Sequence, residues 1–197
     1  WWARGSILLW LVAGMWLLHE SRDVLPVDRV VELASAAAPL RSFVDPNDAV
    51  FAEPGDMPAR IREYCARTGQ DEPADPGALA RCILESLALK HAQTLDLLRD
   101  AADASPSEVH VVGGGAQNEL LCRWTANASG LPVLAGPVEA TVHGNLAVQA
   151  MALGELASLE DAREVVRRSV EPTVYEPEPD AAWREAVEKC IGPDALD

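Results

Sequence analysis

The sequence predicts an α/β fold in which a parallel βαβ unit is flanked by helices. Two patterns indicate this. Residues 108–112 (EVHVV) and 131–135 (LPVLA) are short runs of strand-forming residues, and a helical pattern over 116–128 separates them. A strand, a helix and a second strand at this spacing are typical of a crossover between parallel strands. On both sides of this unit, apolar residues recur at helical spacing, which predicts the flanking helices.

The amino-terminal half is predicted to be helical, with one irregular interruption. Residues 6–21 and 27–37 form helices, and the apolar run in the first is too short to span a bilayer. Residues 39–76 form an irregular Pro-rich excursion that contains one short helix, 58–68. The longest helix follows, over about 77–102. Its predicted apolar stripe consists of Leu84, Leu87, Ala88, His91, Leu95 and Leu98.

Three helices complete the predicted domain behind the second strand. They cover 139–153, 158–169 and 180–190, and the last two are predicted to be closing surface helices. The domain therefore extends over 1–192, and 193–197 form a frayed tail. The inward residues predicted for the helix between the strands are Ala116, Leu120, Leu121, Trp124 and Ala128.

Composition and charge restrict the class of protein. The chain has 197 residues, of which 49% are hydrophobic and 24% charged, as in a globular protein with a real core. Its formal net charge of −15 repels nucleic acid and anionic lipid, so neither a nucleic acid nor a membrane is expected as a partner. A small phosphorylated ligand remains compatible with this charge, because backbone amides can hold one. Because no initiator Met begins the chain, we expect it to be a fragment of a longer protein.

The cysteines and histidines predict no metal site. Cys65, Cys82, Cys122 and Cys190 contain no CxxC pair, and the histidines have no metal-binding spacing. We interpret the cysteines as buried thiols. Cys65 and Cys82 flank one loop and could be neighbours, and whether they form a disulfide is left open.

The stretch VHVVGGGAQN, residues 109–118, is the candidate site. A strand ends in Gly113, Gly114 and Gly115, where the backbone either turns in a way that glycine allows or is approached closely by a ligand. The carboxyl end of a parallel strand is where α/β proteins bind ligands. A tight turn without a ligand is an equal alternative at this stage. The pattern fits neither a Rossmann fingerprint, which needs Gly where Asn118 stands, nor a P-loop.

A longer series of motifs resembles the carboxyl-terminal half of the FGGY-type carbohydrate kinases, and within that family the rhamnulokinases most. The series contains the GGGxQN turn, the strand GLPVxAGPVEAT and the helix GNxxxQxxALGE. It extends back through FxxPGDMPARIREYCxxTGQ and ALARCILESLALK to GMWLLHESR. The resemblance therefore covers nearly the whole chain, and it implies a partial actin/RNase H-like ATPase lobe that lacks the amino-terminal sugar lobe.

The resemblance also implies roles for particular residues. The glycine turn, Gly113 to Gly115, would line an adenosine pocket, and Asn118 would contact the adenine or the ribose. Gln117 is a weaker candidate, and Glu85 is interpreted as structural. His143, after the second strand, is a further candidate that more often only caps or packs. No catalytic residue is assigned, because the family's catalytic aspartate and Gly-Thr hairpin lie upstream of anything in this chain.

The implied function is ATP-dependent phosphorylation of a ketose with Mg²⁺, in the cytoplasm, by the intact protein. The expected reaction converts L-rhamnulose to L-rhamnulose 1-phosphate, and this chain alone is expected to be inactive. Two alternatives stay open: an inert truncated lobe that binds only nucleotide or a partner chain, and a kinase for another sugar such as xylulose or fuculose. The sequence leaves the oligomeric state open.

Overall fold

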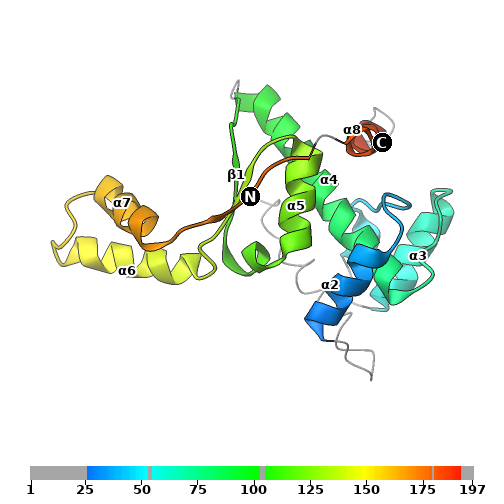
Figure 1. Cartoon of the computed structure of the whole chain (residues 1–197), viewed down its shortest axis with the longest axis horizontal. Coiled ribbons are helices and arrows are strands. Elements are labelled where there is room, and N and C mark those ends of the chain that lie inside the picture. Colours follow the sequence, from blue (N-terminus) through cyan, green and yellow to red (C-terminus); the bar gives the residue numbers. More distant parts are fainter. Residues whose placement is uncertain (1–25, 53–54, 103–104, 179, 192–197) are drawn as a thin grey trace. The chain divides into compact units, whose positions relative to one another are not determined.

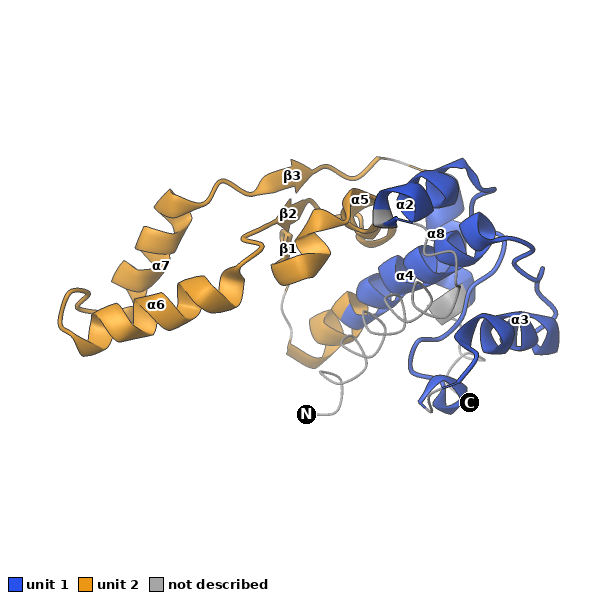
Figure 2. Ribbon diagram, turned by 90° about the horizontal axis from the view of Figure 1, so that it is seen from below, with its two compact units in different colours: residues 1–94, 181–197 blue, residues 95–180 orange. Residues whose placement is uncertain are grey.

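The computed structural model describes residues 26–52, 55–102, 105–178 and 180–191 (Figure 1). The helix predicted at 6–21 and the tail predicted at 193–197 lie outside the described residues. The chain divides into two compact units, one formed by 1–94 with 181–197 and the other by 95–180 (Figure 2).

The first unit is helical. The helices predicted at 27–37, 58–68 and 77–102 are confirmed to within one residue at each end. Its elements are α2 (Val27–Ala36), the 3₁₀ helix η1 (Ala49–Phe51), α3 (Met57–Arg67), α8 (Ala181–Ile191) and most of α4 (Pro76–Ala102), whose last turns belong to the second unit.

Side-chain caps and one close approach fix where these helices begin and how they pack. The Asp56 carboxylate accepts a bond from the Ala59 amide at 3.0 Å at the start of α3, and Asp75 accepts from the Ala78 amide at 2.9 Å at the start of α4. Gly77 lies against α2: a Cβ atom there would be 2.8 Å from the Leu33 carbonyl oxygen. Glycine at this position therefore lets α2 and α4 approach each other.

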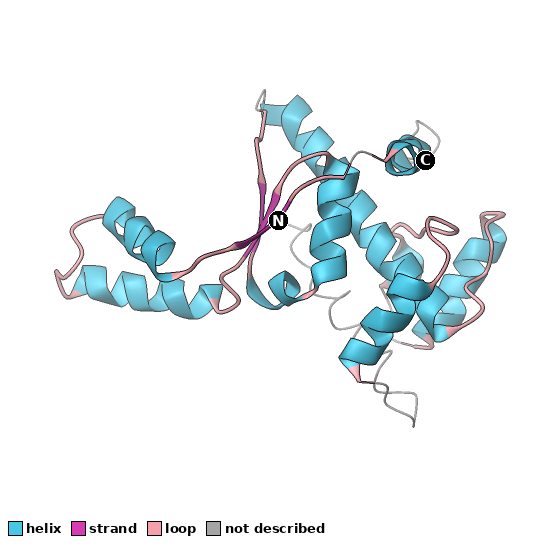
Figure 3. Cartoon of the chain, viewed as in Figure 1, coloured by secondary structure: helices cyan, strands magenta, loops and turns pink. Residues whose placement is uncertain are grey.

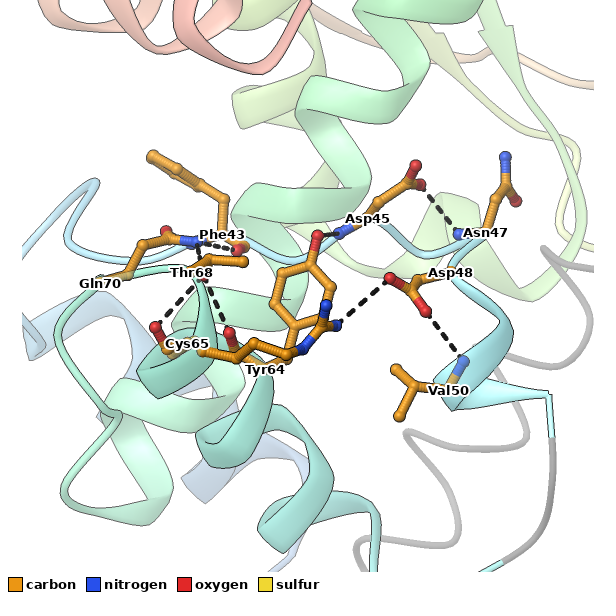
Figure 4. Close-up of polar contacts among 10 residues, drawn as sticks. Phe43, Asp45, Asn47, Asp48, Val50, Tyr64, Cys65, Thr68 and Gln70 are labelled. Atoms are coloured by element: carbon orange, nitrogen blue, oxygen red, sulfur yellow. Dashed lines mark hydrogen bonds and ion pairs between the residues drawn. The ribbon is translucent and has the colours of Figure 1, made fainter. Parts of the chain in front are cut away.

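The predicted excursion over 39–76 contains α3 and is tied down by side-chain bonds to the backbone (Figure 4). The Gln70 amide accepts from the Phe43 N–H at 2.7 Å and donates to the Phe43 carbonyl at 2.8 Å. The Tyr64 hydroxyl accepts from the Asp45 N–H at 3.3 Å, and Asp48 forms an ion pair with Arg67. The segment lacks regular structure over much of its described length, but side chains bond several of its backbone groups.

Cys65 and Cys82 lie in the core between α3 and α4. Both thiols are buried and free, so no disulfide joins them. They are neighbours, as the sequence suggested. The hydrogen bond between the two thiols lowers the pKa of Cys65, and the same bond together with burial raises the pKa of Cys82. The other buried residues of this core are Val44, Phe51, Met57, Ile61, Leu79 and Ile83.

The stripe predicted for α4 is partly wrong. Ala88 is buried and His91 is half-buried, where burial lowers the pKa of its imidazole. Leu98, however, is 54% exposed, and the last buried residue of the helix is Ala92. Apolar periodicity indicates which face of a helix packs, but it does not show where along the helix the packing partner ends.

The second unit contains a three-stranded sheet (Figure 3). Strands β1 (Val109–Val111) and β2 (Val133–Ala135) are parallel, which confirms the predicted βαβ unit. A third strand, β3 (Thr173–Tyr175), pairs antiparallel with β2 and was not predicted. The sheet order is β1-β2-β3, so β2 is the central strand and its Val133 is fully buried.

Helix α5 (Glu119–Ser129) connects β1 to β2, and its Cys122 and Ala126 pack with β2 in the core. It begins three residues later than the predicted 116, because the 3₁₀ helix η2 (Gly113–Gln117) precedes it. It ends at Gly130, which has a left-handed φ of 66°. The predicted inward residues Leu121 and Trp124 are buried. Ala116, Leu120 and Ala128 are half-buried.

Helices α6 (Ala140–Ala152) and α7 (Leu159–Ser169) follow β2 and confirm the predicted helices there. They pack against each other, and Ser158 caps α7 by accepting from the Asp161 amide at 3.1 Å. Both α7 and α8 are surface helices, as predicted, because most of the described residues of each are exposed. Each also has a buried face: α7 buries Ala162, and α8 buries Trp183, which is only 5% exposed.

Candidate functional site

The candidate site lies where β1 and β2 end. Val112 continues β1 in an extended conformation, and the chain then turns at Gly113, whose φ of +77° is in the left-handed region that favours glycine. The turn continues as η2 and leads directly into α5. All five residues predicted for the site (Gly113, Gly114, Gly115, Gln117 and Asn118) therefore lie on this one turn.

Backbone bonds hold the turn against the segment that follows β2. The Gly136 N–H donates to the Val111 carbonyl at 2.8 Å, and the Gly113 N–H donates to the Pro137 carbonyl at 2.9 Å. Parallel pairing thus continues past the ends of both strands. Because the Gly113 N–H is already bonded within the fold, Gly113 serves the turn itself and offers no backbone donor to a ligand.

The other two glycines differ from Gly113. A Cβ atom built at Gly114 would meet nothing within 4 Å, and Gly114 is exposed. A Cβ atom at Gly115 would be 3.7 Å from a methyl group of Val111, which is an ordinary contact. Gly114 is thus the position where the absence of a side chain leaves open space above the backbone, which a flat ligand can approach.

Asn118 has a structural role beside any role in binding. Its side-chain oxygen accepts from the Leu121 N–H at 3.0 Å and so caps the start of α5. Its backbone carbonyl accepts from the Cys122 N–H at 3.0 Å. With the side-chain oxygen held by the cap, the side-chain NH₂ is the group of Asn118 that suits a ligand acceptor. Gln117, one residue earlier, is exposed.

A thiol lies beneath the turn. Burial and the nearby Glu119 carboxylate raise the pKa of Cys122 to about 11, so this residue stays a neutral thiol at physiological pH. Its Sγ lies 3.7 Å from the Gly115 carbonyl oxygen, which places the S–H as a weak donor to the turn. Cys122 thus supports the turn from the α5 side, and it is not a reactive cysteine.

The charges around the turn favour an uncharged ligand group over a phosphate. Glu119 lies in the first turn of α5, and Glu139 is the residue directly before α6. A helix amino terminus attracts anions, but a carboxylate at the same end offsets this attraction. Val112 and Val138, one from each strand end, are exposed apolar residues beside the glycines. The site therefore suits a base or a sugar. Sequence reasoning missed both valines, although Val112 follows directly on β1 and Val138 lies three residues after the end of β2.

Two other candidates lie apart from the turn. Glu85 is in the first unit and only 1% exposed, where it accepts from the Arg81 guanidinium at 2.7 Å and from the Leu40 N–H at 2.9 Å. These bonds support its interpretation as structural. His143 lies in α6 and lines a groove of about 600 Å³ between α6 and α7.

Among the described residues, no group of three or more His, Cys, Asp or Glu side chains gathers in a way that could hold a metal ion. None of the described helices is long and apolar enough to cross a membrane.

Comparison with known proteins assigns the chain to a class. Residues 3–153 match the model of the carboxyl-terminal domain of the FGGY family of carbohydrate kinases. The chain therefore belongs to this family, and the predicted α/β fold of an actin/RNase H-like ATPase lobe is confirmed.

Two relatives define the match further. The chain is 44% identical over 185 residues to the rhamnulokinase of Bacteroides thetaiotaomicron, covering 91% of this chain and 38% of that protein. The crystal structure of xylulose kinase from Rhodospirillum rubrum aligns with a TM-score of 0.56 at 18% identity, over 99% of this chain and 39% of that one. The chain thus spans less than half the length of either relative, and within the family it is rhamnulokinase-like.

Proposed function

We propose that the intact protein transfers the γ-phosphate of ATP to a ketose, converting L-rhamnulose to L-rhamnulose 1-phosphate in the cytoplasm, and that this chain binds the adenosine. The observation that carries the proposal is the 44% identity to a rhamnulokinase across almost the whole chain. The likeness to a xylulose kinase, at 18% identity, supports the fold and does not discriminate between sugars.

The geometry of the glycine turn supports the adenosine part of the proposal. The open space over Gly114 admits a flat ring, the exposed Val112 and Val138 offer it apolar contact, and the Asn118 NH₂ offers a donor. Mg²⁺ would arrive with the nucleotide, since this ion is commonly held by phosphate oxygens together with one or two carboxylates.

The chain alone is proposed to be inactive. Phosphoryl transfer depends on holding the nucleophile, the metal ion and the γ-phosphate together, and the proposed role of this chain covers only the adenosine. The alternative is a lobe that binds nucleotide or a partner chain without catalysis, and the share of its relatives that the chain spans, 38% and 39%, favours this alternative for the chain by itself.

Calorimetric titration of the chain with Mg·ADP tests the adenosine site. The wild-type chain should bind saturably, and Gly114→Val should abolish binding without unfolding the chain, because a side chain there enters open space. Asn118→Ala removes both the NH₂ donor and the helix cap, whereas Asn118→Ser keeps a cap and lacks the NH₂. If both Asn118 variants bind Mg·ADP more weakly than the wild-type chain, the side-chain NH₂ of Asn118 contacts the nucleotide.

Two results would contradict the adenosine site. One is a folded wild-type chain that does not bind Mg·ADP. The other is wild-type affinity in Gly114→Val, which would leave the glycines with a purely conformational role. The sugar is tested separately, by assaying the intact protein that contains this chain with L-rhamnulose, xylulose and fuculose. A preference for xylulose or fuculose would contradict the rhamnulokinase assignment.

A further inference from the structure

A groove of about 600 Å³ lies between α6 and α7, which are yellow and orange in Figure 1. Its volume is within the range of pockets that bind small molecules, about 300–1,000 Å³. One face of each helix lines it, and most of the lining side chains are aliphatic, such as Ala147, Met151 and Val166. None of the five site residues of the glycine turn lines it, so the groove is a separate site.

Gly144 leaves the groove open on the α6 side. It lines the groove, and a Cβ atom built there would meet nothing within 4 Å. Glycine in the middle of a helix is less favourable than alanine. At this position it leaves room for a ligand directly above the helix backbone.

One polar atom inside the groove lacks a partner. Nδ1 of His143 is buried and, within the part of the chain that the structure describes, has no hydrogen-bond partner. The other histidine of the groove, His110, bonds the Glu108 carboxylate through Nε2 at 2.8 Å. Buried polar atoms are almost always bonded, so a ligand atom that bonds Nδ1 of His143 fits here. The tautomer with its proton on Nδ1 donates to an acid group.

The permanently charged side chains of the groove are both positive. Arg163 and Arg167, one turn apart on α7, line it, and no Asp or Glu does, although the whole chain has 31 acidic residues against 16 basic ones. Both guanidiniums form exposed ion pairs with Glu160, and Arg167 also pairs with Glu164. Exposed pairs are weak and a guanidinium has five N–H donors, so these pairs leave both arginines able to bind a further anion.

We propose that this groove binds an amphipathic anion, an aliphatic carboxylate of medium chain length. The alkyl chain lies along the aliphatic walls above Gly144, the carboxylate accepts a hydrogen bond from His143, and the two guanidiniums supply positive charge. A wholly polar anion would leave the walls in water, and an uncharged apolar molecule would leave Nδ1 unbonded. This proposal does not depend on the kinase assignment.

The net charge of the chain is compatible with such a ligand. Charges more than about 10 Å away are largely screened at about 0.1 M salt. The net charge of −15 is spread over the chain, whereas the two guanidiniums line the groove itself. At moderate salt, the local positive charge therefore acts more strongly on a single carboxylate than the distant acidic residues do.

Fluorescence titration of the 197-residue chain with anilinonaphthalene sulfonate, an amphipathic anion, tests the proposal. The probe should bind saturably, and decanoate should displace it from the groove. Decanol has the same alkyl chain without the charge, and it should displace the probe at least about fivefold less well. Mg·ADP should displace none of the decanoate-sensitive fluorescence.

Two neighbouring substitutions on α6 locate the site. Gly144→Leu fills the groove and should abolish the decanoate-sensitive fluorescence, while the helix is kept because leucine is a better helix former than glycine. Asn145→Leu adds the same side chain one position along, at a residue that does not line the groove, and should bind decanoate as the wild-type chain does. Circular dichroism confirms that each variant is folded.

Further substitutions test the charge and the buried nitrogen. The double variant Arg163→Gln, Arg167→Gln should raise the Kd for decanoate about tenfold and leave that for decanol unchanged. His143→Phe keeps a ring in the groove and removes Nδ1, so it should also weaken decanoate binding more than decanol binding.

Four outcomes would overturn the proposal. Decanoate and decanol displace the probe equally well, or Gly144→Leu binds decanoate like the wild-type chain. Mg·ADP displaces the decanoate-sensitive probe, which would assign that probe to the glycine turn. The intact protein that contains this chain does not bind decanoate, which would show that other polypeptide covers the groove. Mg·ADP binding is measured on the same variants by calorimetry, so failure of the groove and failure of the adenosine site are separable.

Discussion

Single residues of the glycine turn have separable roles, and stability measurements can distinguish them. Gly113→Ala forces a side chain into a left-handed conformation with φ of +77° and should lower the free energy of unfolding by about 1–2 kcal/mol. Gly114→Ala meets neither a positive φ nor a neighbouring atom and should leave stability unchanged or raise it by a few tenths of a kcal/mol. Urea denaturation of both variants measures this difference. Equal losses in the two would show that the turn adopts another conformation in solution.

Glu85 offers a second prediction at the residue scale. Glu85→Ala leaves the largely buried Arg81 guanidinium without its carboxylate and should cost about 3–5 kcal/mol. Glu85→Gln keeps an acceptor for the Leu40 N–H and should cost less. Urea denaturation at neutral pH compares the two variants. An alanine variant that is as stable as the glutamine variant would show that the ion pair does not support the fold.

The stability of the same pair should depend on pH in a defined direction. Burial raises the pKa of Glu85 in the folded chain, although the Arg81 guanidinium opposes the shift. The folded state therefore holds this proton more tightly, and its contribution to stability falls as the pH rises from about 4.3 through the raised pKa. The cost of Glu85→Gln should accordingly be larger near pH 4 than near pH 7. A cost that grows with pH would mean that Arg81 dominates and lowers the pKa instead.

At the scale of elements, helices could be predicted from the sequence and the third strand could not. Long periodic segments such as α4 have a strong pattern, so their ends are correct to within one residue. Strand β3 is only three residues long, with Pro172 before it and Pro177 close behind it. It forms because β2 offers an open edge, which is a tertiary cause that no local pattern contains. The start of α5 was misplaced for a local reason: Asn118 was considered only as a ligand group, not as a helix cap.

Helices α7 and α8 have similar lengths but should differ in their importance for stability. Trp183 of α8 is 5% exposed, so Trp183→Ala should cost about 3–5 kcal/mol through lost burial and the cavity left behind. Val165 of α7 is about half exposed, and Val165→Ala should change stability by about 0.5 kcal/mol or less. Chemical denaturation followed by circular dichroism compares the two. A small effect of Trp183→Ala would show that the buried face of α8 does not support the fold.

The molecule as a whole combines a fold that could be predicted with a site that could be predicted only in part. The βαβ unit and the five residues of the turn follow from the sequence, because strand, glycines and helix are consecutive there. Three features of the site could not be predicted: the different roles of the three glycines, the helix cap formed by Asn118, and the position of the two valines beside the turn. They depend on how β2 and the turn that follows it lie beside β1. Such contacts between distant segments are what a local pattern lacks.

The charge of the whole molecule predicts which part of the nucleotide the chain binds. With a net charge of −15, and with Glu119 and Glu139 at the helix starts beside the turn, each added phosphate should weaken binding in the absence of Mg²⁺. Titration in EDTA should therefore rank adenosine above ADP and ADP above ATP. Raising NaCl from about 20 to about 200 mM should narrow these differences, because salt screens exposed charges. Adenosine, which is uncharged, is the matched control and should respond little to salt. Affinity that rises with each phosphate would show that this chain holds phosphate-binding groups of its own, and the adenosine assignment would then have to be extended along the nucleotide.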